Sequence, residues 1–214
     1  DKRFNVNSNM IYNPLNLNQI KRKSYSKINF KIFKKKNSIK FINVARFTDQ
    51  KDHMTLLKAF KKLNHIINYE LLIMGYGVNY FKIKNYIIKN GLNKNINIIK
   101  FQKNPYKFIN KSNVLILSST FEGLPNVLLE ALTLGKPVIS SNCPTGPNEI
   151  LSNGKGGQLF KIGDYKSLSK KIVYLMKNYS QCMKKTKHAI SKLNRYDKKK
   201  NLNEYYKLIL KVMS

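Results

Sequence analysis

The sequence predicts an α/β protein with a Rossmann-like, doubly wound parallel sheet of about six strands, followed by C-terminal helices. Short apolar runs alternate with helical patterns along the chain, which is typical of a parallel sheet covered by helices. The 214 residues suffice for one ordinary domain with a sizeable core. Several polar candidate residues follow predicted strands, and doubly wound sheets bind ligands beyond the carboxyl ends of their strands.

The first half of the chain begins with a polar segment, in which only a short helix at 17–23 is expected. Asp52 is the expected N-cap of the first long helix, and Gly91 is the expected C-terminal glycine of the second. The remaining expected elements are a strand at 41–45, a helix at 52–66, a strand at 69–74, a helix at 80–90, a strand at 96–101, a short helix at 106–110 and a strand at 114–117.

The second half continues the alternation. Pro125 suits the first position of a helix because its ring fixes φ. The elements expected after it are a strand at 137–141, a turn at 144–147, a strand at 158–160, and helices at 165–178, 181–193 and 202–212.

The net charge is strongly positive, with 41 Lys and Arg against 10 Asp and Glu. A formal charge of +31 would normally suggest a nucleic-acid partner. However, only four residues are arginine, and the excess of lysine together with abundant Asn and Ile indicates a composition bias on a solvated surface. Between residues 112 and 154 the bias disappears, because Lys136 is the only basic residue there. We expect that stretch to be constrained by burial or by chemistry, and we expect no nucleic acid to bind.

Cysteine usage and hydropathy exclude several other classes. Cys143 and Cys182 are isolated, so neither a metal site nor a disulfide framework is expected. The sequence contains no apolar run approaching the ~18 residues of a membrane span and no signal-peptide pattern. We therefore expect a cytoplasmic protein. The chain begins at Asp1 without a methionine, and we expect that a preceding segment is missing.

The most informative segment runs from Ser118 to Leu132. It reads as a buried strand, a Glu-Gly turn and a helix, with Glu122 at the helix start and Glu130 among leucines. A buried ionised carboxylate needs a partner, and the first amides of a helix favour an anion. A phosphate at the helix start and a carboxylate for hydroxyls together suggest a sugar-nucleotide site.

Other candidate residues follow other strands at the same edge of the expected sheet. They are Arg46 and Lys51 after the first strand, Gly75 and Gly77 after the second, Gln102 to Asn104 after the third, and Thr145 and Gly146 after the fifth. This convergence carries more weight than any one motif. A tight turn alone would explain the Gly75-Tyr76-Gly77 segment equally well.

The chain resembles the retaining glycosyltransferase family 4 from about residue 10 to 180. The segment 44–60 is similar to the first motif of that family, and Glu122 to Glu130 resembles its Glu-x7-Glu signature, with the sequel Gly135-Lys136-Pro137-Val138-Ile139. The segment 143–150 most resembles members that transfer hexoses or N-acetylhexosamines from UDP in polysaccharide assembly.

The resemblance implies only the C-terminal, donor-binding half of a GT-B enzyme. Residues 1–38 would form the linker and the start of the domain, residues 39–180 the nucleotide-sugar-binding domain, and residues 181–214 the C-terminal helices. The N-terminal acceptor domain would be absent. We expect the isolated chain to bind nucleotide weakly and to have little or no transferase activity.

The resemblance also implies roles for individual residues, which we take as expectations. Arg46 and Lys51 would hold the diphosphate in place of a metal, so no metal and no cofactor beyond the donor is expected. Glu130 would accept hydrogen bonds from the ribose hydroxyls, and Glu122 would contact the donor sugar. The other expected donor contacts are the amides of Gly123 and Leu124 and the turn at Thr145 and Gly146.

Some positions depart from the family pattern. Tyr76 and Val78 stand where an acidic residue and a proline are usual, and Gln102-Lys103 replaces a hydrophobic-glycine pair near the base pocket. These side chains therefore give no indication of the base. Glu149 is expected at a helix start rather than in catalysis. The three histidines, which lie on predicted helices, are expected at the surface; they are His53, His65 and His188.

The sequence thus predicts the donor domain of a hexosyl- or N-acetylhexosaminyltransferase that uses a nucleotide sugar, with a glycan or lipid-linked acceptor. A cytoplasmic site on the inner face of an anionic membrane would suit the lysine-rich surface. Three alternatives stay open: a nucleotide-sugar epimerase of GT-B fold, a basic nucleic-acid-binding domain, and a catalytically dead interaction module.

Overall fold

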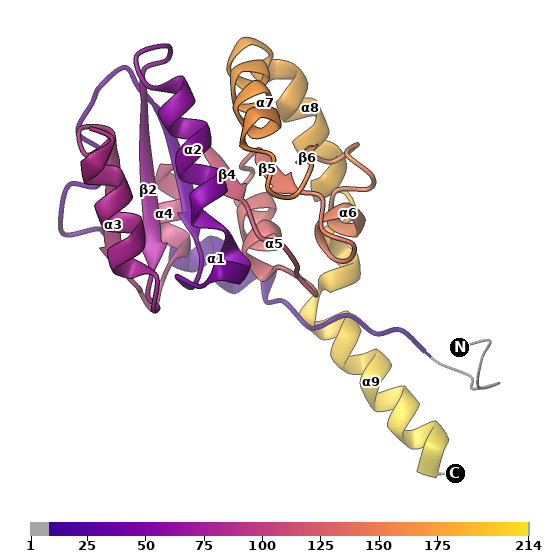
Figure 1. Ribbon diagram of the computed structural model, residues 1–214. Coiled ribbons are helices and arrows are strands. Elements are labelled where there is room, and N and C mark those ends of the chain that lie inside the picture. Colours follow the sequence, from indigo (N-terminus) through magenta and orange to yellow (C-terminus); the bar gives the residue numbers. More distant parts are fainter. Residues whose placement is uncertain (1–8, 214) are drawn as a thin grey trace.

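The computed structural model describes residues 9–213 as a parallel sheet between two layers of helices, so the predicted Rossmann-like architecture is confirmed (Figure 1). The strands are β1 (Ile39–Val44), β2 (Tyr69–Gly75), β3 (Ile96–Lys100), β4 (Val114–Leu117), β5 (Val138–Ser141) and β6 (Gln158–Phe160). The helices are α1 (Leu17–Ser24), α2 (His53–Leu63), α3 (Tyr80–Lys89), α4 (Tyr106–Lys111), α5 (Asn126–Thr133), α6 (Pro147–Ile150), α7 (Tyr165–Lys177), α8 (Tyr179–Ile190) and α9 (Lys198–Met213). Two 3-10 turns are η1 (Asp49–Lys51) and η2 (Leu193–Tyr196).

The strand order places the candidate site at a reversal of the winding. The order is β3-β2-β1-β4-β5-β6, and every described pair is parallel. The chain builds outward from β1 to β3 and then returns to the other side of β1 with β4, where Phe41 is in register with Val114. Loops at such a switch point diverge from one another, and the crevice between them is the usual ligand site of this architecture. The loops after β1 and β4 lie at that switch point.

The core forms on both faces of the sheet because side chains of a strand alternate in direction. Every residue of β2 is buried. Leu71 and Ile73 pack in the core beneath α2, α3 and α7, whereas Leu72 and Met74 pack in the opposite core with α4 and α5. A strand that is covered on both faces reads as a continuous apolar run, which is why the sequence shows this strand clearly.

The segment before β1 packs on the domain. α1 contacts α4 and α5, and Ile20 is buried between them. Leu15 donates its amide to the Tyr196 carbonyl at 2.8 Å and accepts from the Lys198 amide at 3.1 Å, so the first and last parts of the described chain are joined. Residues 1–8 of the expected linker lie outside the described residues.

Several expected boundaries shift in the structure. α5 begins at Asn126, because Pro125 adopts an extended conformation, and Glu130 therefore lies one turn into the helix. The expected turn at 144–147 leads into the short helix α6. The last two helices begin earlier than expected, at Tyr179 and Lys198.

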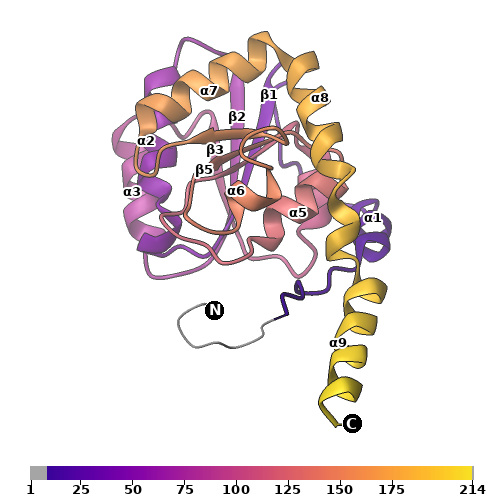
Figure 2. The same cartoon turned by 90° about the vertical axis from the view of Figure 1, so that its right-hand side faces the viewer.

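Helix α9 extends away from the rest of the domain (Figures 1 and 2). Asn201 is its only buried residue among those described. Its large apolar side chains are exposed, and they recur every three or four residues along the helix, which makes one apolar face. They are Leu202, Tyr205, Tyr206, Ile209, Leu210, Val212 and Met213.

The expectation of three surface histidines is wrong for His53, which is only 3% exposed. Its ring meets Phe47 edge-on, with ring centroids 5.2 Å apart. Burial, aided by the nearby positive charge of Lys51, lowers the pKa of His53 to about 4, so the ring is neutral near pH 7. The sequence pattern of α2 does not reveal this, because a first-turn residue is covered here by a neighbouring loop rather than by the apolar face of its own helix.

Candidate functional site

Lys51 and Glu122 form the centre of the candidate site. Lys51 ends η1 in the loop after β1, and Glu122 lies in the loop after β4. Their side chains meet across the switch point, with Nζ of Lys51 2.6 Å from Oε1 of Glu122. The two side chains are 15% and 9% exposed, so this ion pair is largely shielded from water. The structure thus brings together two of the residues that the sequence predicted.

The loop that carries Lys51 has a defined entry into α2. Asp52 lies in the left-handed region at φ 38°, and its side chain accepts a hydrogen bond from the Thr55 amide at 3.0 Å. This confirms the predicted N-cap. Lys51 therefore sits directly before a helix start, where its direction is set by the backbone reversal at Asp52.

Arg46 lies in the same loop without a fixed partner. It follows β1 directly and is half-buried. Within residues 9–213, its guanidinium makes no hydrogen bond or ion pair. An unpaired guanidinium in the loop after β1 is suited to bind an anion from outside.

The loop after β5 closes around Glu122 from the other side. Thr145 donates its hydroxyl to the Glu122 carbonyl at 2.5 Å. Gly146 adopts φ +76°, and a Cβ placed there would lie 2.0 Å from the Gly123 carbonyl oxygen. Only glycine fits such a close approach in that conformation. This places Thr145 and Gly146 at the same sheet edge as Glu122 and Gly123, as the sequence predicted, and the expected contact of their turn with the donor stays a prediction.

Gly123 and Leu124 form the turn before α5. Gly123 is exposed, and Leu124 packs partly against the core beside α5. Their amides donate no hydrogen bond to another described residue. These two free amides lie just before the start of α5 and give this edge of the sheet two further hydrogen-bond donors for an anion or a hydroxyl.

Glu130 has a different environment. It lies on α5 among Leu129 and Ala131, and no described residue donates a hydrogen bond to its carboxylate. Burial raises its pKa from 4.5 to about 7. The pKa of Tyr106 on α4 is also raised, first by burial and then by the negative charge of Glu130, which indicates that the two side chains are neighbours. A partly buried carboxylate without a hydrogen-bond donor is a ready acceptor for ligand hydroxyls.

An apolar cavity of about 500 Å³ lies at the ends of β2 and β3. It is lined by Gly75, Tyr76, Gly77, Tyr80, Lys100 and Phe101. The rings of Tyr76 and Phe101 meet edge-on with centroids 5.7 Å apart, and both are more than half exposed. Gly77, at φ +145°, would bring a Cβ within 2.5 Å of the Phe47 carbonyl oxygen, so this turn also packs on the loop after β1.

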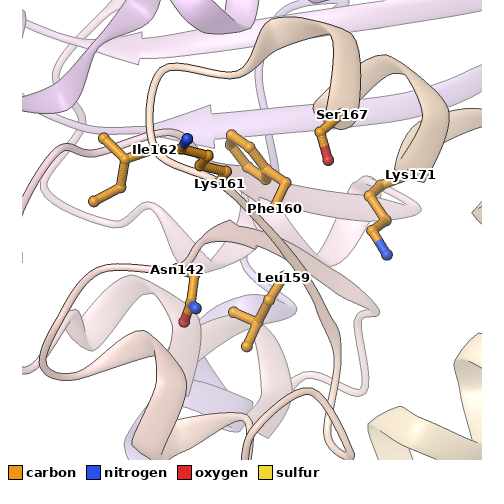
Figure 3. Close-up of a pocket in the computed structure, with 7 residues that line it drawn as sticks. All are labelled: Asn142, Leu159, Phe160, Lys161, Ile162, Ser167 and Lys171. Carbon is orange, nitrogen blue, oxygen red and sulfur yellow. The ribbon is translucent and has the colours of Figure 1, made fainter.

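A second hollow, of about 480 Å³, lies at the ends of β5 and β6 (Figure 3). Figure 3 shows Ser167 and Lys171 from α7 on one side of it, with Asn142 and Leu159 on another. None of the residues predicted from the sequence lines this hollow. We therefore assign the candidate site to the switch point between β1 and β4.

Sequence reasoning missed the serines that support the Glu122 turn. Ser119 is fully buried and donates its hydroxyl to Oε1 of Glu122 at 2.6 Å. Ser118 donates to the Lys51 carbonyl at 2.9 Å. Two consecutive serines at the end of an apolar strand were the available signal, because buried hydroxyls require partners. Glu149, expected at a helix start, lies in α6 and accepts a hydrogen bond from the Tyr12 hydroxyl.

The described residues contain no group of three His, Cys, Asp or Glu side chains arranged to hold a metal ion. In the part of the chain that the structure covers, every helix is too short or too polar to cross a bilayer.

Comparison with known proteins identifies a matching family model, described as glycosyl transferases group 1, over residues 24–196. An uncharacterized glycosyltransferase of Methanocaldococcus jannaschii is 44% identical over 117 residues, which are 54% of this chain and 29% of that protein. The N-acetylgalactosamine-N,N'-diacetylbacillosaminyl-diphospho-undecaprenol 4-alpha-N-acetylgalactosaminyltransferase of Campylobacter jejuni is 25% identical over 202 residues, 94% of this chain and 53% of that protein.

Among solved structures, an Anabaena protein crystallised in complex with UDP superposes with a TM-score of 0.80 at 17% identity. The match covers 95% of this chain and 57% of the Anabaena chain. At this identity the likeness concerns the fold. The chain spans about half the length of these relatives, or less.

Proposed function

Because the chain belongs to the glycosyl transferases group 1 family, we propose that it is the donor-binding half of a retaining glycosyltransferase. The donor is a UDP-hexose or a UDP-N-acetylhexosamine, and the acceptor is a glycan or a lipid-linked saccharide. UDP in the Anabaena structure and the lipid-linked acceptor in the name of the Campylobacter relative support this choice.

One observation carries the proposal: two carboxylates of the same segment differ in their hydrogen-bond partners within the chain. Glu122 is held at the switch point by Lys51, whereas Glu130 is partly buried and accepts no hydrogen bond from a described residue. A nucleotide sugar has hydroxyls at both ends and a diphosphate between them. The ribose hydroxyls donate to Glu130, a hydroxyl of the donor sugar donates to Glu122, and the diphosphate lies against Arg46, Lys51 and the free amides of the turn.

The chemical step leaves negative charge on the departing UDP. Arg46 and Lys51 neutralise that charge, which lowers the barrier to breaking the bond between the sugar and the diphosphate without a metal ion. Thr145 and Gly146 fix the Glu122 turn against which the sugar is held. These roles require the two cations to face the diphosphate, so Lys51 partly leaves Glu122 when the donor binds.

The acceptor-binding half is the other partner. The exposed apolar face of α9 is suited to pack against it. Without that half, the chain binds nucleotide weakly and transfers little or no sugar. The lysine-rich surface, in turn, suits docking on anionic lipid at the inner face of the membrane. Co-sedimentation with vesicles that contain or lack anionic phospholipid tests this, and equal failure to bind both would contradict it.

Calorimetric titration of UDP into the purified chain tests the proposal, with ADP and GDP as comparisons. Arg46→Ala should weaken UDP binding roughly tenfold, because it removes a charged hydrogen-bond donor. Arg22→Ala is the matched control, since Arg22 is an exposed arginine on α1. Equal affinity of wild type and Arg46→Ala, with binding that vanishes at moderate salt, would show that the lysines alone attract the nucleotide.

A further inference from the structure

The carboxylate of Glu122 is held on one side only. Its Oε1 accepts from Nζ of Lys51 and from Oγ of Ser119, both at 2.6 Å. No described residue donates to Oε2. The side that carries Oε2 is therefore the one open to a hydroxyl group of a ligand.

Ser119 is itself held by the end of β5. It is fully buried, and its carbonyl accepts the Ser141 hydroxyl at 2.6 Å and the Cys143 thiol at 3.3 Å. Both donors are buried as well. These contacts fix the main chain at Ser119, and its hydroxyl can then point at Glu122 from a constant position.

The two donors differ in what happens when a nucleotide diphosphate arrives. Lys51 is a cation and must divide its three N–H groups between Glu122 and the phosphates. The Ser119 hydroxyl is neutral, buried and directed at Oε1, so the diphosphate does not compete for it.

We infer that Ser119 is a positioning residue for the donor sugar: it keeps the Glu122 carboxylate in place, with Oε2 toward the sugar, while Lys51 turns to the diphosphate. This inference rests on the proposed function. It predicts that Ser119 affects binding of the sugar and not of the nucleotide, a separation that a general structural role would not produce.

The test compares UDP with UDP-glucose and UDP-N-acetylglucosamine by calorimetry on the 214-residue chain. In the wild type, at least one UDP-sugar should bind more tightly than UDP. Ser119→Ala should abolish that gain, a loss of roughly fivefold to tenfold, and should change UDP affinity less than about twofold. Ser119→Thr, which keeps the hydroxyl, should retain the gain.

Ser140→Ala is the matched control. Ser140 is equally buried, and its hydroxyl donates to the main-chain carbonyl of Ser141 at 3.0 Å. This variant should bind like the wild type. Should Ser119→Ala fail to fold, Ser119→Cys keeps a donor at the same position, although a larger and weaker one, and should show the same loss in smaller amount.

Three results would overturn the inference. The first is an undiminished gain in affinity from the sugar in Ser119→Ala, and the second is an equal loss of affinity for UDP and UDP-sugar. The third needs no ligand: an unchanged Glu122 carboxylate in a crystal structure of Ser119→Ala. Absence of UDP binding by the wild type would instead contradict the proposed function.

Discussion

Glu122 and Glu130 lie eight positions apart in the sequence, yet the fold treats them in opposite ways. Glu122 accepts from a lysine and a buried serine, so its negative charge is compensated within the chain. Glu130 is partly buried without a described donor, and desolvation raises its pKa to about 7. In the first arrangement the ion pair and the serine hydrogen bond offset the cost of shielding the charge from water, whereas the second costs stability unless a ligand supplies hydrogen bonds. The difference indicates that the chain itself positions Glu122 before a ligand binds, whereas Glu130 receives its hydrogen-bond donors from the ligand.

The largest effect is expected from removing the cation beside Glu122. Lys51→Met should lower the free energy of unfolding by about 3 kcal/mol, because it leaves a shielded carboxylate without its counter-charge. Adding Glu122→Gln to that variant should restore most of the loss. Urea denaturation at pH 7 measures both.

Lys82→Met is the matched control for this prediction. It breaks the Lys82–Asp49 pair, whose side chains are 56% and 84% exposed, and should cost less than about 1 kcal/mol. Equal losses in Lys51→Met and Lys82→Met would mean that the Lys51–Glu122 pair is no more than a surface ion pair.

Glu130→Gln, in contrast to Lys51→Met, should raise the free energy of unfolding. Below the unfolded-state pKa of 4.5, Glu130 is protonated in both states and costs nothing. Between that pH and about 7 the unfolded chain loses the proton and the folded chain keeps it, so stability falls as pH rises. The penalty then stays constant, at up to about 3 kcal/mol.

Thermal unfolding of wild type and Glu130→Gln from pH 4 to pH 8 measures this penalty. The variant's advantage should be absent near pH 4 and full near pH 8. Glu204→Gln, on the exposed α9, is the control and should match the wild type throughout. A difference in stability between the two proteins that is the same at all pH values would contradict the explanation by a raised pKa of Glu130.

Nucleotide affinity should depend on pH through the same carboxylate. Hydroxyl donors prefer the ionised form, and a pKa of about 7 leaves only a minority of Glu130 ionised at pH 6. UDP should therefore bind the wild type roughly tenfold more weakly at pH 6 than at pH 8. Titration of UDP itself affects both proteins equally, so Glu130→Gln is the control. The difference in UDP affinity between the wild type and Glu130→Gln should be smaller at pH 6 than at pH 8. A constant ratio of affinities would contradict the prediction.

The smallest effect on stability is expected at Arg46. Because no described residue pairs with its guanidinium, Arg46→Ala should change the free energy of unfolding by less than about 0.5 kcal/mol. Its importance should appear only in binding. A large loss of stability in Arg46→Ala would show that Arg46 stabilises the fold and is not kept free for a ligand.

The sequence predicted the sheet well because strands buried on both faces leave continuous apolar runs, as in β2. Since parallel strands end at one edge, it also placed Lys51 and Glu122 at the same edge, but it did not predict their ion pair. It could not predict which hydroxyl would reach Glu122, because the Ser119 contact depends on a loop conformation that has no periodic signal. The burial of His53 was missed for the same reason: a loop covers it, and loops carry no hydrophobic period.

The most direct test of donor binding is whether Glu130 accepts hydrogen bonds from the ribose hydroxyls. Calorimetry should compare UDP with 2′-deoxy-UDP at pH 8 in the wild type and in Glu130→Gln. We predict that the wild type prefers UDP roughly tenfold and that Glu130→Gln binds both nucleotides equally. Equal affinities in the wild type, or an unchanged preference in Glu130→Gln, would contradict the assignment of Glu130 to the ribose and with it the proposed placement of the donor.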